Sequence, residues 1–442
     1  MPDPTSVGRY PVIVIPGITA TSLVDDYPIG GEEIWSAVLN KDFQRLTLHP
    51  DDLRYEAQGP ALVQTGRLFE LTYKDLILAL RHELSPSADQ PTPVFSFSYD
   101  WRHDVRETAK VLDRFIEEVI ARTRLLRHYA SWYPGEPRVH VVAHSMGGIV
   151  MCEYLSQFAQ KKRIARVCTL CTPFQGSIEA VCKLLTGIGY LSGEQPKERE
   201  RESARTFQAV YQLLPSFKGA AIRLANGADV DLYRPSEWQA SIIESMSEFV
   251  RLHSVIGNSD IQAGGNNRVA AQILDDMLDG ARQVRDNVSN LGQALFAAGL
   301  SPNDWLAVVG VGAKTRLRID VGEKNGSPWF SIDDHAFVDE WSDDHDNGNT
   351  GDSTVPLSGA IAPFLPRESH VAVTPDDFGT FELADRVLLN LAGFHAQVPN
   401  LNLAQRLVVK HLLPSFTGPV WGRPLPGVAQ WNPPIPQLTR RS

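Results

Sequence analysis

The sequence predicts an α/β fold with a mostly parallel central sheet and helices on both faces. Short, continuous apolar runs occur at 10–17, 138–143 and 305–310, and such runs are typical of strands buried on both faces. Segments with helical spacing, at 108–127 and 147–158, alternate with the strands. Alternation of strand and helix at these lengths favours a parallel sheet covered by helices.

The first part of the chain is expected to hold four strands and two helices. The strands are predicted at 10–17, 94–99, 138–143 and 166–170. The helix at 108–127 has one apolar face, made by Val111, Leu112, Phe115, Val119 and Ile120. The helix at 147–158 directly follows the third strand after a turn of small residues.

The later part repeats this alternation after two interruptions. Residues 30 to about 75 are polar around Trp35, Phe43 and Phe69, and residues 176 to about 300 are mostly helical. Further strands are predicted at 305–310 and 371–374. A final helix is expected over 401–413, with Asn400 as its cap. The chain after Pro414 is rich in Pro and Gly, so we expect it to be irregular.

Composition excludes several classes of function. The 442 residues carry 42 Lys and Arg against 52 Asp and Glu, a net charge of −10, so no nucleic-acid partner is expected. The N-terminus lacks the pattern of a signal peptide, and no apolar run approaches the roughly 20 residues of a membrane span. We therefore expect a cytoplasmic protein with at most peripheral membrane contact, although a secreted chain without its leader would look the same.

The cysteines and the acidic residues indicate no metal site. Cys168 and Cys171 have C-x-x-C spacing, but they lie in an apolar run without a second Cys or His pair. We interpret them, with Cys152 and Cys182, as buried thiols. The acidic loop at 343–349 lacks the spacing of a calcium-binding EF-hand. No metal and no cofactor are expected.

The strongest chemical signal is the segment Val141-Val-Ala-His-Ser-Met-Gly-Gly148. A buried strand runs through small residues into a helix, which is the context of a nucleophile elbow. Ser145 would stand on the strained turn, with Ala143 and Gly147 as its small neighbours. Ala143 replaces the usual first glycine. The adjacent His144 is interpreted as structural.

A serine nucleophile needs a base and an acid that orients the base. In this context the chain order is Ser, then Asp or Glu, then His. Asp352 is the candidate acid. Of the later histidines, His395 is favoured because it is predicted on a loop beyond the last strand; His370 is the alternative, and His411 lies inside the final helix.

The oxyanion of the reaction needs two backbone N–H donors. One normally belongs to the residue after the nucleophile, here Met146. The other is expected in the loop after the first strand, Pro16-Gly-Ile-Thr-Ala20. Ile18 is the expected donor and Thr19 the alternative.

Five short segments together resemble blocks of one known family. They are Val14-Ile-Pro-Gly17, Ser98-Tyr-Asp-Trp-Arg102, Ala143-His-Ser-Met-Gly147, Thr172-Pro-Phe-Gln-Gly-Ser177 and Gly351-Asp-Ser-Thr-Val-Pro356. In this order they are similar to the lecithin:cholesterol acyltransferase family, which includes lysosomal phospholipases and phospholipid:diacylglycerol acyltransferases. The resemblance extends from residue 11 to about 413.

The resemblance implies an α/β-hydrolase fold in which Ser145, Asp352 and His395 form a triad and Ile18 and Met146 are the oxyanion donors. It also implies a mobile lid after the first strand. Residues 30–70 occupy that place but contain no cysteine, so the lid disulfide of the animal members is absent, which favours a reducing compartment. The chain thus resembles a soluble, bacterial relative of these family members.

The expected domains follow from this resemblance and from the interruptions. They are a first core part at 1–175 with the lid at about 30–70, a helical cap at 176–300, a second core part at 301–415 and a Pro-rich tail at 416–442.

The expected reaction is acyl transfer from a lipid ester, through an acyl-enzyme on Ser145, to water or to an alcohol acceptor. Two alternatives stay open: a soluble esterase or amide hydrolase for small substrates, and a non-catalytic binding protein that kept the fold. The sequence leaves the substrate-binding residues, the acyl-chain length, the head group and the oligomeric state undetermined.

Overall fold

The computed structural model describes most of the chain. The described residues are 9–26, 31–36, 41–48, 63–130, 133, 137–187, 198–253, 265–332, 350–379, 393–436 and 438–440. The acidic loop at 343–349 lies outside them, and so does much of the segment expected as the lid.

The core is a six-stranded sheet in the order β12-β9-β7-β6-β1-β5, in which all neighbouring strands are parallel. Its strands are β1 (Val12–Ile15), β5 (Val94–Ser96), β6 (Val139–His144), β7 (Ile164–Leu170), β9 (Trp305–Gly310) and β12 (His370–Val373). This arrangement confirms the predicted α/β fold class. Strand β5 is shorter than the predicted 94–99.

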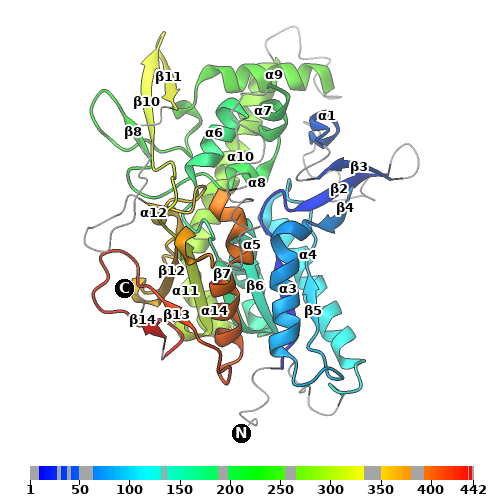
Figure 1. The fold of residues 1–442 in the computed structure, drawn as a ribbon. Coiled ribbons are helices and arrows are strands. Elements are labelled where there is room, and N and C mark those ends of the chain that lie inside the picture. Colours follow the sequence, from blue (N-terminus) through cyan, green and yellow to red (C-terminus); the bar gives the residue numbers. More distant parts are fainter. Residues whose placement is uncertain are drawn as a thin grey trace.

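Helices cover both faces of this sheet (Figure 1). Along β1, Ile13 and Ile15 belong to one hydrophobic cluster and Val12 and Val14 to another. The first cluster includes residues of α4 (Val105–Arg124), α5 (Met146–Phe158) and α10 (Gly265–Ser289), and the second those of α3 (Glu70–Leu84) and α14 (Asn402–Leu412). Because both faces are covered, the strand reads as a continuous apolar run.

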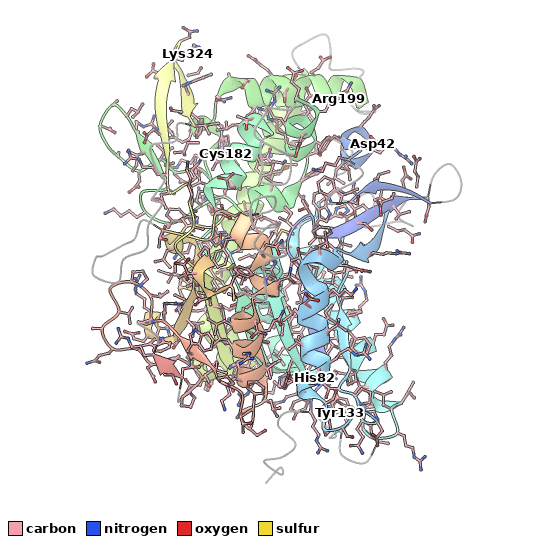
Figure 2. All side chains as sticks on the ribbon, in the orientation of Figure 1. Asp42, His82, Tyr133, Cys182, Arg199 and Lys324 are labelled. Carbon is pink, nitrogen blue, oxygen red and sulfur yellow. The ribbon has the colours of Figure 1, made fainter. Side chains whose placement is uncertain are left out.

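A small antiparallel sheet follows the first core strand, in the order β3-β2-β4. Its strands are β2 (Thr21–Asp25), β3 (Glu32–Trp35) and β4 (Val63–Leu68), and the short helix α1 (Phe43–Leu46) lies between β3 and β4 in the chain. Helix α1 contacts α7 (Glu198–Ala204). Figure 2 labels Asp42 and Arg199, one from each side of this junction, and both line the same surface pocket.

A second group of helices stands beyond the sheet, in green in Figure 1. Besides α7 and α10 it contains α6 (Ile178–Thr186), α8 (Gln208–Tyr211) and α9 (Ala240–His253); α11 (Leu291–Ala297) follows α10. Strand β8 (Ala221–Arg223) of this region pairs with β10 (Ile319–Lys324), which pairs with β11 (Ser327–Ser331). The chain beyond residue 300 thus returns to this region, and the proposed domain boundaries stay a prediction.

The remaining regular elements are short. They are α12 (Leu357–Ala360), β13 (Trp421–Gly422), β14 (Thr439–Arg440) and the 3₁₀ turns Ala159–Lys161, Pro235–Glu237, Pro302–Asp304, Arg367–Ser369, Pro375–Asp377 and Val398–Asn400. The C-terminal tail is therefore not wholly irregular, because β13 pairs with β14.

The expected cap of the last helix is wrong. Helix α14 begins after Leu401 and has no side-chain cap, because Asn400 belongs to the preceding 3₁₀ turn. The Asn400 amide instead donates to the Leu71 carbonyl (2.6 Å) and to Gln397. Its side chain thus joins the C-terminal segment to α3, a contact that only the tertiary structure provides.

The four cysteines are free and buried, as expected. In the part of the chain that is described, every helix is too short or too polar to cross a bilayer.

One buried carboxyl group makes stability depend on pH. Glu153 lies on α5, fully buried, and the Asn287 amide of α10 donates to its carboxylate oxygens at 3.1 and 3.2 Å. Burial raises the pKa of Glu153 from its ordinary 4.5 to about 7. The folded chain therefore binds this proton more tightly than the unfolded chain, so the free energy of unfolding falls as pH rises through this interval.

Replacing Glu153 by Gln is expected to stabilise the protein at pH 8 by an amount on the order of 3 kcal/mol, because the neutral amide avoids ionisation in a buried site. At pH 4 the difference should nearly vanish. Urea unfolding at both pH values measures it. The exposed Glu107→Gln change is the control, and an equal difference at both pH values would contradict the assignment.

Candidate active site

Ser145 stands on a strained turn between β6 and α5. Its φ is +53°, in the left-handed region that non-glycine residues avoid. The turn needs a glycine two residues later, because a Cβ on Gly147 would lie 2.5 Å from the Ile15 carbonyl oxygen. The strand–turn–helix context predicted from the sequence is therefore present, and the turn sets the Ser145 side chain at the carboxyl edge of the sheet.

The structure brings Ser145, His395 and Asp352 together. His395 Nε2 lies 2.8 Å from Ser145 Oγ, and His395 Nδ1 lies 2.7 Å from Asp352 Oδ2. All three residues are buried: Ser145 is 7% exposed, His395 8% and Asp352 0%. This is the geometry in which a histidine can take the serine proton while a carboxylate orients its ring.

Asp352 is held by its own loop. Its Oδ1 accepts the backbone N–H groups of Val355 (2.6 Å) and Thr354 (3.0 Å), which leaves Oδ2 for His395. The loop approaches the end of β9 closely, because a Cβ on Gly310 would lie 2.5 Å from Asp352 Cβ. These contacts fix which oxygen faces the histidine.

His395 lies beside Ser145, but its local structure differs from the predicted one. His395 lies in a short helical segment, 393–397, rather than on a loop. The alternatives are engaged elsewhere: His370 Nε2 accepts from the Ala362 N–H, and His411 Nε2 lies 3.2 Å from the Asp304 carbonyl oxygen. The structure thus brings only His395 of these three to Ser145.

The loop after β1 lies beside Ser145, as expected for an oxyanion site. Ile18 and Thr19 line the same cavity as Ser145. Met146 is the first residue of α5, where backbone N–H groups have no acceptor within the helix. Thr19 has a φ of +63°, and its carbonyl accepts the Trp35 indole N–H at 2.9 Å.

A buried hydrogen-bond chain joins this loop to His395. The Gly17 N–H donates to Tyr73 Oη (2.9 Å), and Tyr73 Oη lies 2.7 Å from His144 Nδ1. His144 Nε2 lies 3.0 Å from the His395 carbonyl oxygen, which can only accept, so Nε2 carries the proton. Burial lowers the pKa of His144 well below its ordinary value, so its Nδ1 is free to accept the Tyr73 hydroxyl.

Replacing Tyr73 by Phe is expected to lower kcat about 10-fold, with little change in KM. The variant leaves the Gly17 N–H and His144 Nδ1 unpaired, so the loop after β1 and the helical segment that bears His395 lose a positional constraint. Tyr233→Phe is the matched control, because its buried hydroxyl donates to the Leu214 carbonyl away from the site. Equal kcat in the two variants, at similar loss of thermal stability, would contradict a positioning role.

Sequence reasoning missed the residues that hold this loop, although two belong to a motif that it singled out. Tyr99 Oη donates to the Pro16 carbonyl (2.8 Å), and the Trp101 indole N–H donates to the Thr21 carbonyl (3.1 Å). Arg102 pairs with Asp100. The motif Ser98-Tyr-Asp-Trp-Arg102 thus holds the loop after β1 in place, and its aromatic side chains were the available signal.

A cavity of about 220 Å³ opens beside Ser145 and His395. Six aromatic side chains line its wall: Trp35, Phe43, Phe69, Tyr73, Trp101 and Phe207. Three of them, Trp35, Phe43 and Phe69, are the aromatic residues of the polar stretch near the N-terminus. That stretch therefore contributes to the wall of the cavity, together with α6 and α7.

One group of described side chains has donor atoms close enough for a metal ion. Atoms of Cys171, Asp352 and His395 lie within 4.8 Å of one another. Asp352 and His395 are already hydrogen-bonded to each other, and His395 also faces Ser145. Burial raises the pKa of the Cys171 thiol well above its usual value, which disfavours the thiolate that metals prefer. The donor set fits a proton-transfer group better than a metal centre.

Comparison with known proteins agrees with the observed fold class. The model of the lecithin:cholesterol acyltransferase family matches residues 88–251, which confirms the family resemblance over that part of the chain. No curated protein sequence matches. A crystal structure described as the Tle4-Tli4 complex is similar at a TM-score of 0.58 and 15% identity, over 92% of this chain and 98% of that chain.

A second solved structure, the mature Bacillus licheniformis lipase BlEst2, is 16% identical over 48% of this chain and 56% of that chain, at a TM-score of 0.24. The family match and the fold of the first structure establish an α/β-hydrolase fold.

Proposed function

Since the chain matches the lecithin:cholesterol acyltransferase family over residues 88–251, we propose that it is a serine-dependent acyl-ester hydrolase or acyltransferase acting on lipid esters. The observation that carries the proposal is the buried series Ser145–His395–Asp352, with contacts of 2.8 and 2.7 Å. In this proposal His395 removes the proton of Ser145, which attacks the ester carbonyl. Asp352 orients the imidazole and stabilises its charged form.

The N–H groups of Met146 and Ile18 would bind the oxyanion that develops on the carbonyl oxygen. Collapse of the tetrahedral species expels the alcohol, which takes its proton from His395, and leaves the acyl group on Ser145. Water or a second alcohol then attacks the acyl-enzyme, and His395 again accepts and returns the proton. The chain's own residues suffice for every step.

The nature of the cavity supports a lipid substrate. Its wall is mainly aromatic and aliphatic and begins at Ser145, so an acyl chain could leave water while its ester meets the nucleophile. Small water-soluble esters would use little of this apolar surface.

The test combines active-site labelling with product analysis. A fluorophosphonate probe should label the protein stoichiometrically at Ser145, located by mass spectrometry of peptides. A mixed panel of phospholipids and glycerides, with and without an added long-chain alcohol, should yield free fatty acid or a new ester. Absence of both labelling and product would contradict the proposal.

A chain-length series of esters separates the lipid proposal from a small-substrate esterase. We expect turnover to rise with acyl length and at an interface. A preference for short soluble esters without activation by interfaces would favour the esterase, and labelling at Ser145 would exclude a non-catalytic binding protein.

A further inference from the structure

The cavity beside Ser145 is not apolar throughout. Three charged residues, Glu179, Lys183 and Glu200, line it at the side formed by α6 and α7. Glu179 and Lys183 lie about one turn apart on α6, and Glu200 faces them from α7. Lys183 and Glu200 form an ion pair, and Glu179 lies 3.8 Å from Arg316.

Glu200 is the unusual member of this group. Its side chain is 2% exposed, and only one of its carboxylate oxygens is paired, with Lys183 Nζ. The other oxygen, Oε2, is buried and has no hydrogen-bond partner among the described residues. A buried acceptor without a partner has lost its hydrogen bonds to water, and this loss is more unfavourable when the group is charged. A ligand that donates a hydrogen bond to Oε2 would remove this cost.

Lys183 shows how such a ligand could be placed. Its side chain is 25% exposed, whereas that of Glu200 is 2% exposed, and Lys183 Nζ also donates to the Gly187 carbonyl oxygen at 3.1 Å. One negative and one positive group side by side complement a zwitterion, whose cationic end would meet Glu200 and whose anionic end would meet Lys183. A polar head group could thus remain near water while its ester extends toward Ser145.

We propose that the Glu200–Lys183 pair is a head-group subsite that selects zwitterionic lipids bearing a primary ammonium. This inference rests on the proposed lipid-ester function and adds a head-group preference to it. A primary ammonium offers N–H donors to the unpaired Oε2, and charge-assisted hydrogen bonds of this kind are about twice as strong as neutral ones. A quaternary ammonium has the same charge but no N–H group, so it leaves Oε2 unpaired.

The two lipid classes that differ in only this respect are phosphatidylethanolamine and phosphatidylcholine. With identical acyl chains, mixed in the same detergent micelles, they compete for one enzyme at one interface. Mass spectrometry of the two lysolipids gives the ratio of their kcat/KM values. We expect the native chain to prefer phosphatidylethanolamine about 10-fold, which corresponds to about 1.4 kcal/mol.

Glu200→Gln is the decisive variant, because the amide keeps the shape of the side chain but presents an NH₂ group in place of one acceptor. We expect the preference to fall to about 1, because phosphatidylethanolamine turnover falls more than phosphatidylcholine turnover. Glu202→Gln, the same change at an exposed position of α7, should keep the native preference.

Two results would overturn the subsite. The first is a native ratio near 1. The second is a native ratio that survives in Glu200→Gln, and if both lipids then lose turnover equally, Glu200 has a structural role. A stronger preference for the hydroxyl head group of phosphatidylglycerol, included as a third competitor, would also overturn the ammonium assignment.

Labelling of each variant with the fluorophosphonate probe separates this failure from that of the proposed function. A chain that labels at Ser145 and releases fatty acid without head-group preference lacks the subsite alone. A chain that neither labels nor releases fatty acid from any lipid fails the proposed function itself.

Discussion

Replacing Ser145 by Ala is expected to lower kcat for lipid-ester cleavage by about 10⁶-fold, because it removes the nucleophile and the covalent route. The remaining rate would come from substrate binding and the oxyanion donors alone. Fatty-acid release from a fixed lipid substrate, followed to long times, measures the loss, and circular dichroism establishes that the variant is folded.

A double variant makes this prediction specific to the triad. Groups that act as a unit are strongly non-additive, so Ser145→Ala with His395→Ala should be no slower than Ser145→Ala alone. If the two losses multiply, or if Ser145→Ala retains substantial turnover, another residue is the nucleophile.

Asp352→Asn is expected to lower kcat by about 10⁴-fold through the histidine tautomer. Oδ1 of Asp352 accepts two backbone N–H groups, so the amide oxygen of Asn must take that position. Its NH₂ group would then face His395 Nδ1 and require this nitrogen to be an acceptor. The proton would move to Nε2, which could no longer accept the proton of Ser145.

Asp377→Asn is the matched control for that variant. Asp377 is also buried and accepts from a backbone N–H, that of Thr374 (2.9 Å), and from Arg423 Nη1 (2.6 Å). It does not line the cavity, so its replacement should lower stability while kcat stays within about threefold. Similar kcat values for the two variants would contradict the tautomer argument.

Much of the fold could be predicted because the relevant signals are local. The run at 305–310 is the strand β9, and the helix at 147–158 differs from α5 by one residue at its start. The ends of the elements were predicted less accurately than the elements themselves. Helix α4 begins three residues before the predicted start, because Asp104 caps it by accepting the Arg106 N–H at 2.8 Å.

The candidate site was predictable to a different degree in each part. Ser145 could be predicted from the small residues around it, and Asp352 from a family motif. His395 followed from chain order, although its helical setting did not. Tyr73 and Glu200 carry no local signal, because one acts through contacts with residues 17 and 144 and the other through a pair with Lys183.

The sequence by itself determined the α/β class, the turn that bears Ser145 and the candidates for acid and base, because periodicity and steric demands act over a few neighbouring residues. Only the tertiary structure decided which histidine contacts Ser145, which oxygen of Asp352 faces that histidine, and which charged side chains line the cavity. Those contacts join residues that are 17 to 250 positions apart in the sequence, such as Lys183 with Glu200 and His395 with Ser145, and their geometry depends on how the sheet edge, the segment after β1 and the helices α6 and α7 pack together.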